Sequence, residues 1–353
     1  MSHKRFVAHL DLDAFFCAVE VLKDPGLRDK PIVVGGSPDR RGVVAAASYP
    51  ARKFGIHSAM PMAQAVGLCP DLIIISHGFA SYKAYSRIIM GIIADQAPVM
   101  QQVSIDEAYF ELTDSLSDWD DGLIIAKRIK DRISRDIGLT SSVGVATNKL
   151  LAKIASDFDK PDGFTVVRPG TELSFLAPLP VQKISGIGKQ TTTRLNAMGI
   201  KTVLELRNTP QEVLMNRFGK YGVLMSKWAH GIDERTLTEE HRRKSISQER
   251  TFDQDIYEEQ VLLEKLRTMS NSVAETLDKK EMAAKIISVK MRYADFRTVS
   301  KQKSFQRPIW KEHDIYGTAA HLFQKNRDPD QPLRLLGVGV SGLIGREYQL
   351  TLF

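Results

Sequence analysis

Two adjacent carboxylates in an otherwise apolar stretch, Val103–Leu112, constrain this chain more than any other feature of its sequence. Asp106 and Glu107 stand there among Val, Ile, Tyr, Phe and Leu, a composition typical of a β-strand. Two negative charges are costly to remove from water unless something compensates them. Exposure at a strand end, a basic partner or a metal ion would each do so, and the stretch alone leaves these three explanations open.

A second acidic pair, Asp11 and Asp13, follows another apolar run at residues 6–10. If the two runs pair as strands, three or four carboxylates converge, which is the ligand set that hard cations such as Mg²⁺ require. Adjacent strand residues point to opposite faces, so we expect Asp106 to face Asp11 and Glu107 to reach round from a strand end or bend. Asp13 is expected to be structural, as the cap of the following helix or as a turn residue.

The bulk composition predicts a soluble globular protein with a polyanionic partner. At 353 residues, 43% of them hydrophobic, the chain is expected to form roughly two to four domains. With two cysteines, Cys17 and Cys69, a disulfide framework is not expected, which favours a reducing cytosol. No apolar run has the length of a membrane span, and the first residues lack a signal-peptide pattern. The net charge of +7 favours binding to a polyanion such as nucleic acid.

Three basic or glycine-containing segments are candidate phosphate contacts. In residues 48–55, Pro50 suits a first helical position, capped by Ser48 or Tyr49, and Arg52 follows in the first turn. That helix start would bind an anion, although a solvated basic turn explains the same residues equally well.

The other two segments lie between short helices, at residues 184–189 and 217–222. Gly186 and Gly188 with Lys189 form the first, and Lys220 lies in the second. A helix C-cap would explain each glycine by itself. Their duplication at opposite ends of one small helical unit favours a nucleic-acid contact.

The last third of the chain predicts a second α+β unit, after a charged linker at residues 233–244. Lys290 and Arg292 alternate with Val289 and Met291, so we expect one apolar and one all-cationic sheet face. A cationic face suits a phosphate backbone. The chain ends in an apolar tip that predicts a docking peptide, formed by Gln349, Leu350, Leu352 and Phe353.

In order and spacing, these segments resemble the motifs of the Y-family of DNA polymerases over essentially the whole chain. The resemblance is carried by residues 11–20 (DLDAFFCAVE), 48–55 (SYPARKFG), 104–109 (SIDEAY), 142–157 (SVGVATNKLLAKIASD), 160–163 (KPDG), the 186–188 hairpin and the tail. It implies an α+β multidomain right hand with a ferredoxin-like palm, small fingers, a helix-hairpin-helix thumb and an α+β little finger. The implied boundaries are 1–11 and 76–168 (palm), 12–75 (fingers), 169–232 (thumb), 233–244 (linker), 245–345 (little finger) and 346–353 (clamp-binding tail).

The resemblance also implies low-fidelity, lesion-bypassing DNA synthesis without proofreading, by phosphoryl transfer to a primer 3′-OH with two Mg²⁺ ions. Asp11 and Asp106 would bind both metals. Glu107 would bind the metal that activates the 3′-OH, and the Leu12 carbonyl would complete a shell. The implied partners are primed template DNA, dNTPs and a replication sliding clamp, and we expect a monomer in the bacterial cytoplasm, at DNA.

By the same resemblance, Phe16 is a steric gate against a 2′-OH, and Tyr49, Arg52 and Lys160 grip the triphosphate. From the residues alone, Phe16 would be placed in the core and Lys160 called a solvated lysine. Ala46 stands where some relatives carry a hydroxyl that touches the triphosphate, and Ser185 stands where the thumb hairpin often has proline.

Two alternative functions use the same residues. One is a catalytically silent, clamp-tethered DNA-binding scaffold, which the intact Asp11, Asp106 and Glu107 disfavour. The other is a palm-type cyclase, which has no need of the thumb hairpins or the cationic second unit.

Overall fold

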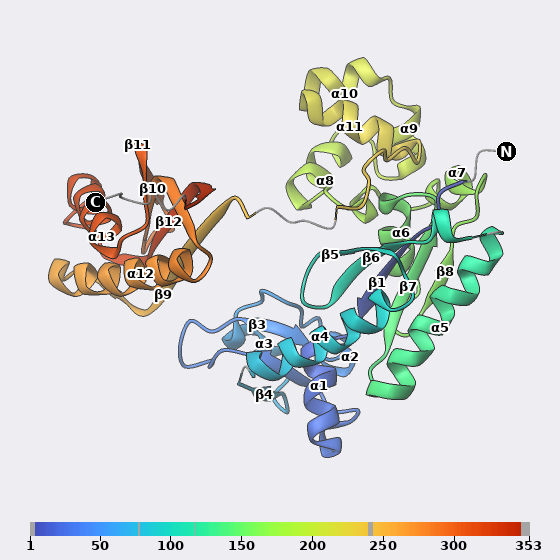
Figure 1. Ribbon diagram of the computed structural model, residues 1–353, viewed down its shortest axis with the longest axis horizontal. Coiled ribbons are helices and arrows are strands. Elements are labelled where there is room, and N and C mark those ends of the chain that lie inside the picture. The colour runs from blue at the N-terminus through green and yellow to red at the C-terminus, as the bar shows by residue number, and fades with distance from the viewer. Residues whose placement is uncertain (1–3, 77, 117, 239–242, 347–353) are drawn as a thin grey trace, which may run out of the picture. The chain divides into compact units, whose positions relative to one another are not determined.

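The structure, a computed structural model, describes residues 4–76, 78–116, 118–238 and 243–346 (Figure 1). The chain forms two compact units, one comprising residues 1–240 apart from 39–41 and the other the remaining residues. Within the described ranges, no helix combines the length and the apolar character needed to cross a membrane. The predicted docking residues Gln349, Leu350, Leu352 and Phe353 lie outside the described residues.

A five-stranded sheet in the order β5-β6-β1-β7-β8 forms the centre of the first unit. Its central strand, β1, is antiparallel to both neighbours and buried along its whole length, which is why its sequence is a continuous apolar run. Helices α4 and α5 cover one face of the sheet and α6 covers the other. The bounds are β1 (Val7–Leu12), β5 (Val99–Gln102), β6 (Glu107–Glu111), β7 (Ser141–Ala146), β8 (Phe164–Val166), α4 (Phe79–Ala94), α5 (Trp119–Ile137) and α6 (Lys149–Ser156).

The strand expected over residues 103–112 begins only at Glu107. Residues 103–106 form the turn between β5 and β6, in which the backbone N–H groups of Val103 and Ser104 donate to the Glu107 carbonyl. The Ser104 hydroxyl closes this turn by accepting from the N–H groups of Asp106 and Glu107. The acidic pair therefore lies at a strand end, as the alternation argument required.

A smaller three-stranded sheet, in the order β3-β2-β4, is flanked by short helices. Helix α2 is capped by Ser48, whose hydroxyl accepts from the Ala51 N–H. The prediction that Asp13 caps α1 is wrong, because Ala14 occupies the N-cap position in a left-handed conformation. The bounds are β2 (Ile32–Gly35), β3 (Val44–Ala47), β4 (Ile73–Ile75), α1 (Phe15–Lys23), α2 (Tyr49–Arg52) and α3 (Met62–Leu68).

Five short helices follow β8: α7 (Glu172–Leu176), α8 (Lys189–Asn196), α9 (Val203–Asn208), α10 (Gln211–Phe218) and α11 (Lys220–Ala229). Gly186 adopts a positive φ in the turn before α8, as a glycine hairpin requires. The second predicted hairpin is wrong in part. Gly222 lies inside α11, where an added Cβ would stand 2.1 Å from the Leu214 carbonyl oxygen of α10, so this glycine serves helix packing.

The first residues of the predicted linker are fixed to the five-stranded unit. Asp233 accepts a hydrogen bond from the Leu150 N–H at the start of α6, and the Arg235 carbonyl accepts one from Arg5. The linker also contains residues 239–242, which lie outside the described residues.

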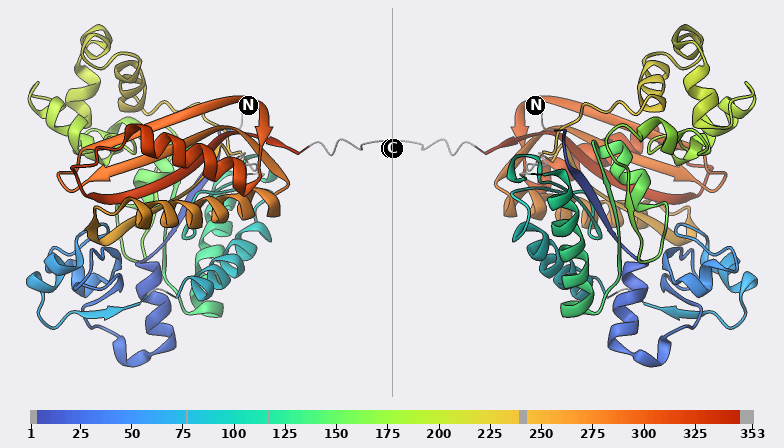
Figure 2. Two further views of the ribbon diagram at one scale, coloured as in Figure 1. Left: turned by 90° about the vertical axis from the view of Figure 1, so that its left-hand side faces the viewer. Right: turned by 90° about the vertical axis from the view of Figure 1, so that its right-hand side faces the viewer.

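The second unit is a four-stranded antiparallel sheet in the order β11-β10-β12-β9, with both of its helices on one face (Figure 2). Val289 and Met291 are buried beneath the helices, while Lys290 and Arg292 point to the open face, as their alternation predicts. The expectation of an all-cationic face is wrong, because Glu249 of β9 pairs with Lys290 at 2.8 Å. The bounds are β9 (Ser245–Ile256), β10 (Met282–Tyr293), β11 (Thr298–Ile309), β12 (Leu333–Gly345), α12 (Glu259–Lys279) and α13 (Glu312–Asn326).

The close contact between β7 and α6 depends on Gly144. An added Cβ at Gly144 would stand 2.2 Å from both the Ala152 carbonyl oxygen and the Ser156 nitrogen of α6. We expect Gly144→Ala to lower the free energy of unfolding by about 3 kcal/mol, because overpacking forces the helix outward. Urea denaturation measures this loss.

The control is Gly91→Ala in α4, where a Cβ meets no described atom within 4 Å. This change should be neutral or stabilise the protein by up to about 1 kcal/mol. Equal losses in the two variants would show that the spacing between β7 and α6 is not the cause.

Candidate active site

The predicted pairing of the two acidic strands is confirmed. Asp11 and Glu107 are register partners on β1 and β6, and the Leu12 N–H donates to the Asp106 carbonyl at 3.0 Å. Three carboxylates thus gather where β1 ends and β6 begins. Residues directly opposite each other on antiparallel strands share one face, so Asp11 and Glu107 project to the same side. The expectation that Asp106 faces Asp11 while Glu107 reaches round is wrong in part, because Glu107 is the register partner of Asp11 and Asp106 lies in the turn before β6.

Two lysine side chains offset part of the negative charge of this acidic cluster. Lys153 of α6 reaches Asp11 Oδ2 at 3.1 Å and Glu107 Oε1 at 2.7 Å. Lys160, in the turn after α6, reaches the other Asp11 oxygen, Oδ1, at 2.7 Å and Asp157 Oδ1 at 2.8 Å. Lys153 is therefore the basic partner of Glu107, whereas the Asp106 carboxylate accepts a hydrogen bond from the Ser104 hydroxyl in its own turn.

The protonation of the cluster follows from burial and from these contacts. Burial raises the pKa of Asp11 to about 6, although Lys153 and Lys160 oppose the shift. The imidazole of His9, 3.7 Å away, and the ammonium of Lys153 hold the pKa of Glu107 well below its usual range.

Behind Glu107 lies His9, a fully buried residue of β1 that the sequence reasoning did not single out. Its Nδ1 is 2.7 Å from the Ser156 hydroxyl, which also donates to the Lys153 carbonyl. Its Nε2 has no hydrogen-bond partner among the described residues. Burial lowers the pKa of His9 to about 4, so the ring is neutral at pH 7. A histidine inside an otherwise apolar strand was the available signal.

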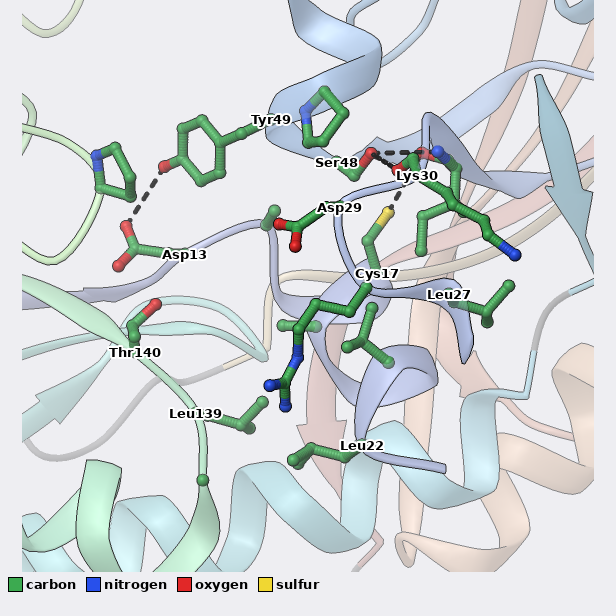
Figure 3. Close-up of a pocket in the computed structure, with 18 of the residues that line it drawn as sticks. Asp13, Cys17, Leu22, Leu27, Asp29, Lys30, Ser48, Tyr49, Leu139 and Thr140 are labelled. Carbon is green, nitrogen blue, oxygen red and sulfur yellow. Dashed lines mark hydrogen bonds between the residues drawn. The ribbon is translucent and has the colours of Figure 1, made fainter. Parts of the chain in front are cut away.

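Asp13 is structural, as expected, although it does not cap a helix. Its carboxylate accepts from the Ser142 hydroxyl at 2.8 Å, from the Asp162 N–H at 2.9 Å and from the Tyr49 hydroxyl at 3.2 Å. Figure 3 shows the bond from Tyr49 in a cavity that Asp13 and Tyr49 line together with residues that include Cys17 and Leu22. Asp13 therefore ties α2 to β7 and to the turn that carries Lys160.

Seven of the predicted site residues line one pocket. They come from β1, α1, α2, the turn before β6 and the turn after α6, and they are Asp11, Leu12, Phe16, Tyr49, Arg52, Asp106 and Lys160. Ala46 lines the pocket without a hydroxyl, as its sequence dictates, and Ser58 is a lining residue that the sequence reasoning missed. A set drawn from five separate segments converges only if the fold is the one that the motifs predict.

The orientation of the pocket side chains is set by their packing. Phe16 stacks on Tyr82, with ring centroids 4.4 Å apart, and Phe79 meets it edge-on. Arg52 donates to the Ala47 carbonyl at 3.0 Å and lies over the ring of Tyr49. These contacts fix the ring of Phe16 and the guanidinium group of Arg52 in the pocket lining.

The donor set of the pocket fits a divalent cation in its chemistry. In the described part of the chain, no group of three or more His, Cys, Asp or Glu residues is arranged to hold a metal ion. Both Asp11 oxygens and Glu107 Oε1 each contact a lysine ammonium group in this structure. Carboxylates with a main-chain carbonyl are the oxygen ligands that Mg²⁺ prefers. The two lysine ammonium groups are themselves cations bound to these oxygens, which shows that the site attracts positive charge.

The predicted DNA contacts occupy two separate places. Lys189 and Lys220 are exposed at the first positions of α8 and α11, and Gly188 is open to solvent beside Lys189. Gly186 packs against Trp228, and its carbonyl accepts from the Tyr221 hydroxyl at 2.6 Å. Lys290 and Arg292 belong to the other unit.

Known proteins match the chain along most of its length. The model of the impB/mucB/samB family matches residues 10–157, and the model of the C-terminal domain of that family matches residues 243–352. A DNA polymerase IV from Dehalococcoides mccartyi (strain CBDB1) is 43% identical over 353 residues, covering 100% of this chain and 90% of the relative. A DNA polymerase IV from Alkalilimnicola ehrlichii is 40% identical over 357 residues, covering 100% of both chains.

Solved structures give the same result. The Y-family DNA polymerase chimera Dbh-Dpo4(243-245)-Dbh superposes with a TM-score of 0.89 at 30% identity, covering 97% of this chain and 100% of the chimera. The insertion ternary complex of Dbh DNA polymerase superposes with a TM-score of 0.66, also at 30% identity and with the same coverage.

Proposed function

This chain belongs to the Y-family of DNA polymerases, the impB/mucB/samB family, and from this premise we propose that it adds deoxynucleotides to a primer 3′-OH by metal-assisted phosphoryl transfer. It is a DNA-directed DNA polymerase of the translesion type with the mixed α+β architecture of that family. The observation that carries the proposed mechanism is the single pocket that joins Asp11, Asp106, Phe16, Tyr49, Arg52 and Lys160.

The pocket offers charges of both signs where a triphosphate needs them. Arg52 and Lys160 supply positive charge, and the Tyr49 hydroxyl stays protonated because burial raises its pKa well above the usual range. Phosphoryl transfer depends on such positioning and charge neutralisation more than on covalent catalysis by the protein. We therefore assign the triphosphate to Tyr49, Arg52 and Lys160.

The carboxylates are assigned to the metal ions that the reaction needs. Asp11, Asp106 and the Leu12 carbonyl would hold two Mg²⁺ ions, with Glu107 serving the one nearer the primer. When bound, such ions lower the pKa of the attacking hydroxyl and stabilise charge on the leaving group. The protein's own part is to keep three carboxylates together at one strand end and to keep Glu107 ionised, for which its lowered pKa is suited.

The proposed domain assignment follows the family pattern. The five-stranded sheet is assigned to the palm (1–11 and 76–168), the small sheet to the fingers (12–75), the helical segment to the thumb (169–232) and the second unit to the little finger (245–345). Residues 346–353 are proposed to bind a sliding clamp. We further propose, from the family resemblance, a monomer that acts at DNA in the bacterial cytoplasm and lacks proofreading.

A clamp-tethered DNA-binding scaffold without catalysis is the alternative. It would have no use for Asp11 and Glu107 held as register partners, each in contact with Lys153. Primer extension with Mg²⁺ separates the two functions. If the wild-type protein binds primed template and fails to extend it, the polymerase proposal is wrong.

Glu107→Gln and Asp106→Asn should reduce primer extension by about 10³-fold or more while leaving DNA binding nearly unchanged, because they remove cation ligands and not DNA contacts. Single-turnover extension and a binding titration measure the two effects. The control is Glu111→Gln on the same strand, whose carboxylate bonds Arg5 and Thr113. A parallel loss of binding in the two active-site variants would identify those residues as structural.

Phe16→Ala should let the protein insert ribonucleotides, because the ring would no longer block a 2′-OH beside the sugar. We expect discrimination against ribonucleotides to fall by about 10²-fold or more, since a clash in a packed site is worth several kcal/mol. Phe79→Ala is the control, because it removes a half-exposed ring from the same aromatic cluster. Unchanged sugar selection in the Phe16 variant would refute the steric gate.

The open sheet face of the second unit should bind the phosphate backbone. Replacing both Lys290 and Arg292 by Ala should weaken binding to primed DNA and reduce the slope of log K against log salt by about two, one for each lost phosphate contact. Lys301 and Lys303 form the matched control pair, because they oppose the buried Val289 and Ile287 and so belong to the other face. Equal effects of the two double variants would show that net charge, and not this face, binds DNA.

A further inference from the structure

Lys153 has no role in the function proposed above, although it makes the most direct contacts with the acidic cluster. It lies on α6, and its side chain is only 18% exposed. Its ammonium group touches Asp11 Oδ2, Glu107 Oε1 and, at 3.8 Å, Asp157 Oδ2. The tight packing of α6 on Gly144 fixes the helix that aims this side chain at the two carboxylates.

We propose that Lys153 is a positioning residue that serves as an internal counter-ion: it holds Glu107 beside Asp11 and competes with divalent cations for their oxygens. This inference rests on the proposed cation site. In this role, the Lys153 ammonium group must move away from the oxygens of Asp11 and Glu107 before a cation can bind them.

The charges of the cluster support this role. Asp11 and Glu107 lie directly opposite each other on neighbouring strands, where like charges repel. Asp11, Glu107 and Asp157 contact the ammonium groups of Lys153 and Lys160, so these five groups carry one net negative charge, and Asp106 adds a second. Burial works to lower the pKa of Lys153, but Asp11, Asp157 and Glu107 together raise it above the usual range, so the ammonium stays charged.

Asp157 is an alternative ion-pair partner for both lysines. It lies one helical turn after Lys153, is 41% exposed, and already contacts both Lys153 and Lys160. A lysine that leaves Asp11 can keep a carboxylate partner at Asp157, so the exchange does not strand a buried charge. A cation bound at Asp11 and Glu107 would then replace one set of ionic contacts by another.

The inference predicts a gain of cation affinity when Lys153 loses its charge. Lys153→Met removes a competing charge about 3 Å from two ligand oxygens, and we expect Mn²⁺ to bind about tenfold more tightly or better. The assay uses the full chain without DNA or nucleotide and follows free Mn²⁺ by electron paramagnetic resonance. A gain of affinity cannot arise from damage to the fold.

Lys149→Met is the matched control. Lys149 lies one turn earlier on α6 and is also buried, but its ammonium bonds Gln101 and lies over the Tyr109 ring. Its removal should change Mn²⁺ affinity by less than about twofold, because it takes the same charge from the same helix without freeing a ligand oxygen. Should Lys153→Met fold poorly by circular dichroism, Lys153→Gln supplies the same neutral change with a polar side chain.

The inference is overturned if the neutral Lys153 variants bind Mn²⁺ no more tightly than wild type, or if Lys149→Met gains as much. Primer extension by the wild-type protein is read separately. Extension without the affinity gain would refute the counter-ion role alone. The affinity gain in a protein that does not extend primers would uphold the counter-ion role and refute the polymerase.

Discussion

The ionic cluster at the end of β1 is the constraint on which the rest of the first unit depends. Asp11 is the penultimate residue of a fully buried strand between two neighbours, where an unpaired carboxylate would be strongly unfavourable. Its two oxygens are satisfied by Lys153 and Lys160, which come from α6 and from the turn after it. The helix must therefore lie close to the sheet, and Gly144 removes the side chain that would keep it away.

The carboxylate of Asp13, just after the end of β1, meets the same requirement without a cation. Asp13 accepts from the Ser142 hydroxyl, the Asp162 N–H and the Tyr49 hydroxyl, and these three donors belong to three different segments. This network joins Tyr49, a proposed triphosphate ligand, to the sheet that carries Asp11 and Glu107, the proposed catalytic carboxylates. In the proposed function Asp11 exchanges its lysine partners for cations, whereas Asp13 keeps its hydrogen bonds.

In the proposed counter-ion role, the basic partners let the acidic cluster exchange lysine for divalent cations. A carboxylate cluster compensated by hydrogen bonds from the backbone would hold its geometry and bind cations weakly. Lysine side chains are long and mobile, so they can release the oxygens of Asp11 and Glu107 and keep Asp157 as a partner. Lys160 also lines the pocket beside Tyr49 and Arg52, so it can pass from a carboxylate to a phosphate.

The sequence by itself determined what local patterns control. The buried run of β1, the alternation of Val289 with Lys290 and the Ser48 cap all follow from residue type and period, and the order of the motifs identified the residues that share the pocket. Tertiary structure decided the rest. It decided that Asp13 binds a distant N–H and two hydroxyls instead of capping α1, that Glu249 pairs with Lys290, and that Lys153 lies on Asp11, 142 positions away. Such contacts depend on how separate helices and strands pack against each other. The periodic pattern of residues along one helix or strand carries no information about charges on another element, so the sequence could not predict these pairs.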